Sequence, residues 1–330
     1  MKKLALAAFA ALCLGTASMS SAKELRLGMS APEATPWGAA AKAMAAKVAE
    51  LSGGELTISL YFNNELGDGQ TMARQIARGR LDMGVLSNVE ASLVLPEYGL
   101  LNAPYLFTSE KQADCVIDNH VGATFDAAFR KAGAVYLAPI EVGDMMIMAK
   151  SPFRLPSDIA REKIRTSPAP TDTYYVQATG AEAVPLSVPE TMPALKTGAV
   201  VAITTPIIMG VAGGYWAEAP DFIMTDHSHQ IGALLLSRTT WDRLDESQRN
   251  ALTEGAKAMS GLRQGVRAAE KALLAKATAG GAHVIELTPE EKAAWMAVAP
   301  AAQAKIVASI GGDAGEVWAK LQAASAACAN

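Results

Sequence analysis

The sequence predicts a two-lobed α/β protein whose lobes close around a cleft by a hinge. Two successive sets of alternating strand and helix patterns occur, in residues 24–86 and 135–204. No Gly/Ser-rich linker separates the two sets, so we expect several chain crossings between two lobes. Lobes joined in this way leave a cleft between them and move relative to one another by a hinge.

The first set of patterns has the order of a parallel sheet. Apolar and polar residues alternate in residues 24–29 and 55–62, as they do in strands. Thr35 followed by Pro36 is typical of a helix start, and Gly53 of a helix end. The patterns occur in the order strand 24–29, helix 35–53, strand 55–62, helix 66–79 and strand 81–86. This βαβαβ order predicts a mostly parallel sheet with helices on both faces.

The second set continues the alternation and ends in a long helix. Residues 246–278 form a largely uninterrupted helical pattern, and Thr288 with Glu291 forms a capping box that opens the next helix. Residues 231–236 are typical of a buried strand that returns toward the first lobe. The expected elements are strands 135–140, 145–149, 163–166, 184–186, 200–204, 231–236 and 283–287, and helices 171–179, 189–196 and 246–278.

The amino-terminal segment has the pattern of a secretory signal peptide. Lys2 and Lys3 precede an apolar run over residues 4–17, and residues 20–22 are small, as a cleavage site requires. We expect cleavage near Ala22 and a soluble product in the periplasm, with an uncleaved anchor as the alternative. No later segment is expected to span a membrane.

Charge and cysteine content agree with an exported protein. Loss of Lys2 and Lys3 changes the formal net charge from −4 to −6, and an acidic exported chain is a poor nucleic-acid binder. Once Cys13 is removed with the signal peptide, Cys115 and Cys328 remain. An export compartment permits a disulfide, but the sequence leaves open both a bridge and two unpaired thiols.

Arg165 is the most informative single residue of the chain. Ile164 and Thr166 favour a strand, and Pro168 prevents the strand from continuing. Arg165 is therefore expected near the carboxyl end of a strand, where α/β sheets bind ligands. A guanidinium there offers a planar pair of donors that matches a carboxylate, although a structural ion pair is the alternative role.

Several short motifs occur in a fixed order along the chain, and together they are more specific than any one of them. In order they lie at residues 28–31, 60–62, 65–68, 79–83, 103–107, 163–165, 180–181, 184–186 and 194–198, followed by Pro206 and His227. This ordered set resembles the periplasmic solute-binding proteins of tripartite ATP-independent periplasmic (TRAP) transporters, of the dicarboxylate-binding type. The resemblance covers nearly the whole mature chain.

The resemblance implies a solute-binding protein rather than an enzyme, and we expect no cofactor; Thr204–Thr205 argues against a metal in the pocket. The resemblance also implies two lobes with a long helix spanning both, and delivery of a carboxylate solute to a permease of one small and one large membrane subunit. The Arg that binds the solute carboxylate in that family is matched by Arg165. We expect a monomer with one lobe of residues 23–142 and 231–270 and a second lobe of residues 143–230 and 271–330.

The chain departs from the family pattern at several pocket positions. The Asn that commonly assists the Arg is replaced by Thr205, and Thr204–Thr205 replaces the Glu-Trp pair of metal-using members. A second family Arg appears as Met145, and a third matches Glu90 by spacing. A pocket with one cation favours a monocarboxylate with an apolar body, or a zwitterion whose ammonium meets Glu90, over a compact dicarboxylate or sialic acid.

Each of the remaining candidate residues has two possible roles. Ser30, Ser87 and Asn88 follow strands and could contact the ligand or only form turns. His227 and His229 could serve a metal-dependent hydrolase, the rival function, or be structural. Met146 and Ile207 are further candidates for an apolar pocket wall. The expected ligand contacts are Ser30, Ser87, Asn88, Glu90, Met145, Arg165, Pro168, Val188, Thr205 and His227.

Overall fold

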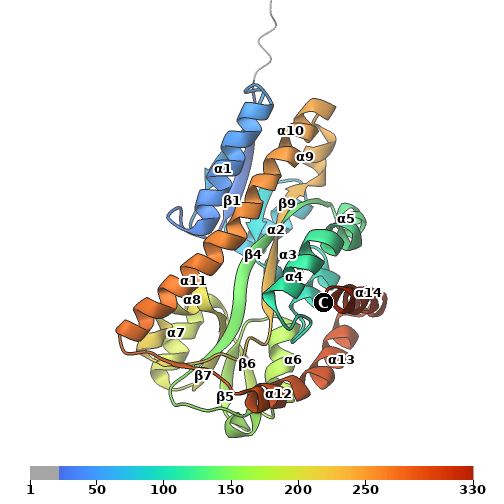
Figure 1. The fold of residues 1–330 in the computed structure, drawn as a ribbon. Coiled ribbons are helices and arrows are strands. Elements are labelled where there is room, and N and C mark those ends of the chain that lie inside the picture. The colour runs from blue at the N-terminus through green and yellow to red at the C-terminus, as the bar shows by residue number, and fades with distance from the viewer. Residues whose placement is uncertain (1–21, 330) are drawn as a thin grey trace, which may run out of the picture.

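The computed structural model describes residues 22–329 and has the mixed α/β architecture that the sequence predicts, with one lobe above the other in Figure 1. The predicted signal peptide lies, except for Ala22, outside the described residues, so its cleavage stays a prediction. A 10-stranded sheet runs through both lobes, with the strand order β2-β1-β3-β9-β4-β7-β5-β6 and with β8 and β10 attached beside β4.

The first-lobe part of the sheet has parallel strands at one edge. β1 pairs in parallel with β2 and β3, and β9 pairs antiparallel with β3 and β4. This arrangement confirms the parallel sheet predicted from the βαβαβ order. The strands are β1 (Lys23–Met29), β2 (Leu56–Tyr61), β3 (Met83–Leu86), β9 (His229–Ser237) and the first half of β4 (Ala134–Ala149).

The second-lobe part of the sheet begins where β4 leaves β9. From Met145 onward β4 pairs with β7, and β7 pairs in parallel with β5, which pairs in parallel with β6. The strands are β5 (Lys163–Thr166), β6 (Glu182–Pro185), β7 (Ala202–Pro206), β8 (Asp221–Ile223) and β10 (His283–Ile285).

The sequence predicts two strands, at residues 135–140 and 145–149, but the structure has one continuous strand, β4. The predicted break between the two was therefore wrong. Glu141 to Asp144 remain paired with β9, with a register shift between Glu141 and Gly143. Gly143 has a φ of +111°, a conformation that glycine adopts without strain, so the extra residue is absorbed as a bulge. β4 therefore passes from one lobe to the other (Figure 1).

Helices cover both parts of the sheet. Thr35 caps α1 by accepting the N–H of Gly38, as its position before Pro36 predicted. The predicted helix 246–278 is divided by a 3-10 turn, η5, into α10 and α11. The helices are α1 (Pro36–Leu51), α2 (Gly69–Ala77), α4 (Glu110–Val116), α5 (Gly122–Lys131), α6 (Pro170–Ala178), α7 (Val188–Thr197), α10 (Glu246–Ala256) and α11 (Gly261–Ala279), with the short turn η5 (Lys257–Ser260) between the last two.

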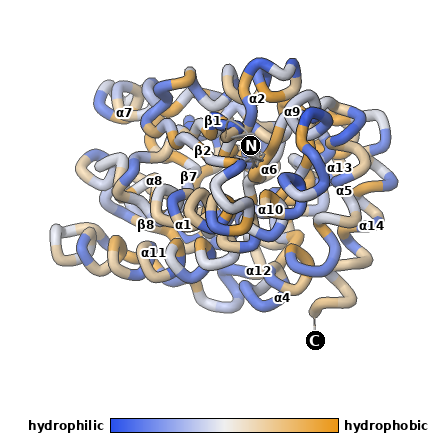
Figure 2. The backbone as a smooth tube through the Cα atoms, turned by 90° about the horizontal axis from the view of Figure 1, so that it is seen from above, coloured by the Kyte–Doolittle hydropathy of each residue, from blue (hydrophilic) through white to orange (hydrophobic). Residues whose placement is uncertain are grey.

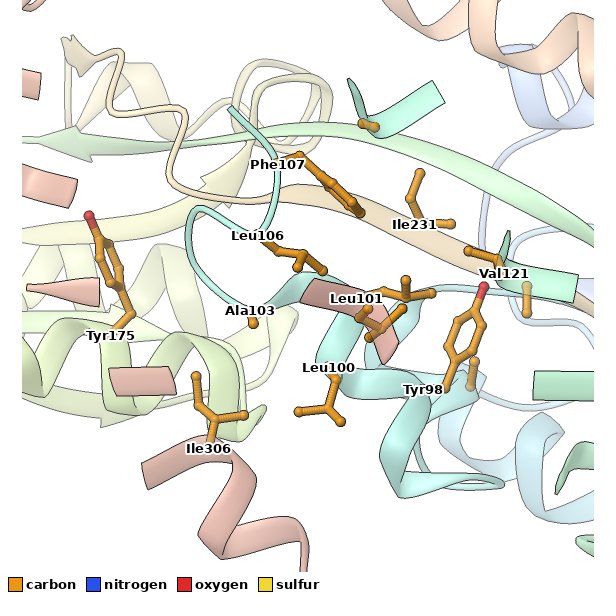
Figure 3. Packing of buried hydrophobic residues seen from close by; sticks show 14 of the residues in the cluster. Tyr98, Leu100, Leu101, Ala103, Leu106, Phe107, Val121, Tyr175, Ile231 and Ile306 are labelled. Carbon is orange, nitrogen blue, oxygen red and sulfur yellow. The ribbon is translucent and has the colours of Figure 1, made fainter. Parts of the chain in front are cut away.

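Apolar side chains fill the space between the sheet and these helices. One cluster continues from the first lobe into the second, from Tyr98 and Leu100 to Tyr175 and Ile306 (Figure 3). Hydrophobic and hydrophilic stretches alternate along α11 (Figure 2), as expected for a helix with one packed face. Val266 and Leu262 of α11 belong to the core behind the first-lobe sheet.

The carboxyl-terminal helices contact both lobes. α12 (Pro289–Ala297) and α13 (Ala299–Ile310) lie by the second lobe, where α13 packs on α6. α14 (Ala314–Ala327) packs instead on α4, and a disulfide joins Cys115 to Cys328. The sequence-based division placed residues 271–330 in the second lobe, whereas α14 contacts elements assigned to the first.

One later segment is long and apolar enough to cross a membrane, by length and composition alone, which contradicts the expectation of none. It is Pro289–Ile310, with a mean hydropathy of 1.3 in its best window. Trp295, Ala302 and Ile306 within it are buried in the core. The segment comprises two helices, α12 and α13, and one such segment alone is weak evidence for a membrane span.

Candidate functional site

Arg165 is a buried cation at the end of a parallel strand. It lies in β5 and is 6% exposed. Its Nε and Nη2 donate to the Leu186 carbonyl at 3.0 and 2.7 Å, and Nη1 donates to the Thr204 carbonyl at 3.3 Å. Among the described residues, no carboxylate oxygen lies within 4.0 Å of this guanidinium. Buried arginines are ordinarily paired, so this one has unused capacity for an anion.

A buried carboxyl group supports the loop that follows Arg165. Asp172, in the first turn of α6, accepts hydrogen bonds from the Ser167 hydroxyl at 2.6 Å and the Ser167 N–H at 3.3 Å. Burial raises the pKa of Asp172, while the Ser167 hydrogen bond and the charge of Arg165 act in the opposite direction. Burial likewise lowers the pKa of Arg165, which the Asp172 charge opposes. The sequence did not single out Asp172.

The two threonines that replace the family pattern lie on the neighbouring strand. Thr204 and Thr205 of β7 are buried, and the Thr204 hydroxyl donates to the Arg165 carbonyl at 3.4 Å. The Thr205 hydroxyl donates to the Pro206 carbonyl at 3.3 Å, and Thr205 pairs with Met146 of β4. Thr204 therefore contacts Arg165 through both its carbonyl and its side chain, whereas the Thr205 hydroxyl makes no hydrogen bond to the guanidinium among the described residues.

The other second-lobe candidates surround the same end of the sheet. Pro168 is exposed in the loop after β5, and Val188 is 54% exposed at the start of α7, two residues after the carbonyl that holds Arg165. Met145 is buried, pairs with Pro206, and donates its N–H to the Ser228 carbonyl. The parallel pairing of β5 with β6 and β7 thus gathers Pro168, Val188, Thr205 and Arg165 at one edge.

The first-lobe candidates lie at the carboxyl ends of β1 and β3. Ser30 is exposed directly after β1. Ser87 caps the short helix α3 (Asn88–Ala91), and Glu90 completes its capping box by accepting the Ser87 N–H at 2.6 Å. Asn88 is buried and donates to the carbonyls of Tyr98 and Ile231, so it holds the lobe's interior together. The Ser-x-x-Glu spacing could have indicated this cap from the sequence.

Glu90 is partly buried against α2. A Cβ placed on Gly69 would lie 1.7 Å from the Glu90 Oε1, so the carboxyl group rests on the backbone at the start of that helix. Burial raises the pKa of Glu90, and its hydrogen bonds with Ser87 oppose this. A solute contact by Glu90 stays a prediction.

His227 and His229 do not converge on one site. His227 is 1% exposed and its ring stacks on Tyr175 at a centroid distance of 4.6 Å. Its Nδ1 lies 2.8 Å from the Thr225 hydroxyl, and burial lowers the pKa of His227 to about 3. His229 instead contacts Asp144 and Glu141 of β4. Within residues 22–329, no group of three His, Cys, Asp or Glu is placed to hold a metal ion.

His229 belongs to a partly buried charged group where the chain crosses between the lobes. Sequence reasoning missed this group, although Arg263 and Arg267 recur at helical spacing on one face of α11. Arg267 contacts Asp114 at 2.7 Å and Glu141 at 3.4 Å, and Arg263 contacts Asp114 at 3.0 Å. We call this group the crossing cluster; its members are Asp114, Glu141, Asp144, His229, Arg263 and Arg267.

The crossing cluster makes stability depend on pH through His229. Burial alone would lower the pKa of His229, but its contacts with Asp144 and Glu141 raise that pKa to about 10. Because the pKa of His229 is higher in the folded state, protonated His229 stabilises the fold. This contribution is fully present below about pH 6.5, the pKa of His229 in the unfolded chain, and it is lost as pH rises through about 10. We expect His229→Gln to lower the free energy of unfolding at pH 6 by about 1 to 3 kcal/mol. Urea unfolding of both proteins at pH 6 to 10 checks this; a difference that stays constant over that range would contradict it.

Comparisons with known proteins agree with this architecture. Residues 27–309 match the sequence profile of the bacterial extracellular solute-binding protein family 7. The chain belongs to this family. Family 7 proteins of this kind are the periplasmic solute-binding proteins of TRAP transporters, so the resemblance recognised from the ordered motifs is confirmed. The rival interpretation as a hydrolase is not supported.

Relatives within family 7 carry carboxylate solutes. The 2,3-diketo-L-gulonate-binding periplasmic protein YiaO of Escherichia coli is 25% identical over 75% of this chain and 76% of its own length. A TRAP periplasmic solute-binding protein from Ochrobactrum anthropi has a TM-score of 0.84 and 25% identity, covering 92% of this chain and 96% of its own. Another, from Sulfitobacter, was solved with bound β-D-galacturonate; it has a TM-score of 0.84 and 22% identity, covering 91% of this chain and all of its own.

Proposed function

We propose that this family 7 protein captures a small carboxylate in the periplasm and that Arg165 holds the carboxylate group. The observation that supports this is the buried guanidinium with three backbone-carbonyl contacts and no carboxylate within 4.0 Å among the described residues. A carboxylate solute would supply the missing anion and accept two parallel hydrogen bonds. Burial would strengthen that contact, because little water competes for the guanidinium.

Binding proceeds by closure of one lobe on the other. The solute meets one lobe in the open state, and contacts made only after closure favour the closed state by differential affinity. Ser30, Ser87 and Glu90 of the first lobe are the groups that would meet a solute held by Arg165. The closed protein, a monomer released by cleavage near Ala22, delivers the solute to a permease of one small and one large membrane subunit.

The solute is a monocarboxylate rather than a compact dicarboxylate. One matched cation, Arg165, satisfies one carboxylate, and the second family cation is replaced by the buried Met145. Uronates and 2,3-diketo-L-gulonate, which relatives bind, are also monocarboxylates. Val188 and Ile207 favour an apolar body, whereas Glu90, in its ionised form, would meet an ammonium group.

A thermal-shift panel tests the solute class. We expect millimolar D-galacturonate, D-glucuronate, a branched 2-oxo acid or a neutral amino acid to raise the melting temperature, because a ligand that binds only the folded state stabilises it. At a concentration of about 100 times the Kd the gain is roughly 2.7 kcal/mol. Succinate and malate are tested in the same panel as compact dicarboxylates. Stabilisation by these two alone would contradict the monocarboxylate proposal.

A further inference from the structure

Three segments pass between the lobes, and they meet at the crossing cluster. β4, β9 and α11 run between the upper and lower parts of the molecule (Figure 1). β4 bulges at Glu141 and Gly143, and the Glu141 carbonyl accepts the indole N–H of Trp37 in α1 at 2.9 Å. We therefore expect a change in the angle between the lobes to shift α11 against β4 near this bulge.

Glu270 of α11 is the buried acid at this place that has no cationic partner. It is 7% exposed, and its Oε1 is buried without a hydrogen-bond partner among the described residues. Arg267, one turn earlier on the same helix, is bound to Asp114 and Glu141 instead. A Cβ on Gly143 would lie 2.0 Å from the Glu270 Oε1. The carboxyl group therefore packs directly on the backbone of the strand that crosses between the lobes.

The surroundings of Glu270 favour its uncharged form. Burial raises the pKa of Glu270 most, and the charges of Asp144 and Glu141 raise it further. The charge of His229 and a hydrogen bond with the Asp144 backbone lower it, and the net result is a pKa of about 8. The charged groups that face it are Asp144 and Glu141 from β4 and His229 from β9.

The other elements packed on α11 supply no counter-charge to Glu270. α8 (Ile207–Ala212) contains no titratable side chain. On α1, Lys42 pairs with Glu33 and Lys47 with Glu50 at the surface. On β10, His283 pairs with Asp221.

We propose that Glu270 is a proton-dependent latch on the movement of the lobes. In its uncharged form Glu270 packs against Gly143 and holds α11 on β4. When the proton passes to solvent, the buried carboxylate lies beside the charges of Asp144 and Glu141, and only a hydrogen bond with the Asp144 backbone opposes this repulsion on β4. Conformations in which α11 and β4 separate and water enters therefore gain population. The latch rests on the proposed function, because lobe movement controls solute capture. Solute affinity then varies with pH although Arg165 does not titrate in that range.

The lobe movement is measured without any solute. Nitroxide labels at Ala46→Cys on α1 and Lys196→Cys on α7, both exposed positions, report the interlobe distance by pulsed electron paramagnetic resonance from pH 6 to 10. We expect the distance distribution of the wild type to shift with a midpoint near pH 8. Glu270→Gln, which keeps the shape of the uncharged acid, should retain the pH 6 distribution throughout.

Two further variants keep the test decisive. Glu254 is an exposed acid paired with Lys257. In the Glu254→Gln variant the interlobe distance should shift with pH as it does in the wild type. Glu270→Asp keeps a carboxyl group and should keep a pH-dependent shift, so it serves if the Gln variant fails to fold. An unchanged wild-type distribution from pH 6 to 10, or the same shift in Glu270→Gln, would overturn the latch.

A solute titration separates the two proposals. The Kd for D-galacturonate, measured by calorimetry at pH 6.5 and 9.5, should change at least threefold in the wild type and stay constant in Glu270→Gln. A pH-independent Kd in the wild type overturns the latch alone. If no carboxylate of the thermal-shift panel binds at either pH, the proposed function fails, while the distance measurement still decides the latch.

Discussion

We expect replacement of Arg165 by Ala to abolish most solute binding and to leave the fold intact. Truncation leaves the solute carboxylate buried without its charged partner, which costs about 2 to 5 kcal/mol, or roughly 30-fold or more in Kd. The fold loses only three hydrogen bonds to the carbonyls of Leu186 and Thr204. This loss is offset because the variant no longer buries an unpaired cation. Calorimetry with the solute that stabilises the wild type most, together with thermal unfolding, measures both effects.

Two controls distinguish carboxylate binding from a general effect of charge. Lys163→Ala removes an exposed cation from the same strand, two residues earlier, and should bind as the wild type does. Arg165→Lys keeps the charge but lacks the planar fork, so it should bind between the wild type and the Ala variant. Undiminished affinity in Arg165→Ala would remove the basis of the proposed site.

We expect loss of the Cys115–Cys328 disulfide to lower the free energy of unfolding more than any other change proposed for this protein. The bridge spans a sequence separation of 213 residues and fixes α14 to α4. A loop of that length restricts the unfolded chain strongly, so the paired Cys115→Ser, Cys328→Ser variant should lose about 2 to 5 kcal/mol. Gln112 and Ser325 still hold the two helices by hydrogen bonds, so the variant should fold at moderate temperature. Guanidinium unfolding measures the loss.

Reduction provides the matched control for this variant. Wild-type protein in excess reductant should unfold at nearly the same denaturant concentration as the double Ser variant, and reductant should not affect the variant further. If reduction left the wild-type midpoint unchanged, the bridge would contribute nothing to stability.

Local patterns predicted most elements of the fold. Thr35 with Pro36 marked the start of α1, and Pro168 marked the end of β5, because caps and prolines act on the backbone within a few residues. The division of β4 was the clearest miss. Its Glu141-Val142-Gly143-Asp144 segment has the polar, glycine-containing character of a turn, but pairing with β9 holds it extended.

The candidate site was predicted in part. The position of Arg165 near a strand end could be predicted because its strand and the loop after it are local features. A solute contact by Glu90 stays a prediction; the contacts that the structure gives it are the capping box with Ser87 and the packing on Gly69. Asp172 was missed because the sequence around it gives no sign that Ser167 would turn back onto it.

The sequence by itself determined the family, the two-lobed α/β class and the position of one arginine at a strand end. Those properties depend on local spacing and on motif order, which folding does not alter. Only the tertiary structure decided which charges are paired. It left Arg165 and Glu270 without ionic partners, joined His229 to β4, and brought Cys115 to Cys328. The physical reason is that charge pairing and bridging depend on distances between residues far apart in the chain, which only packing sets.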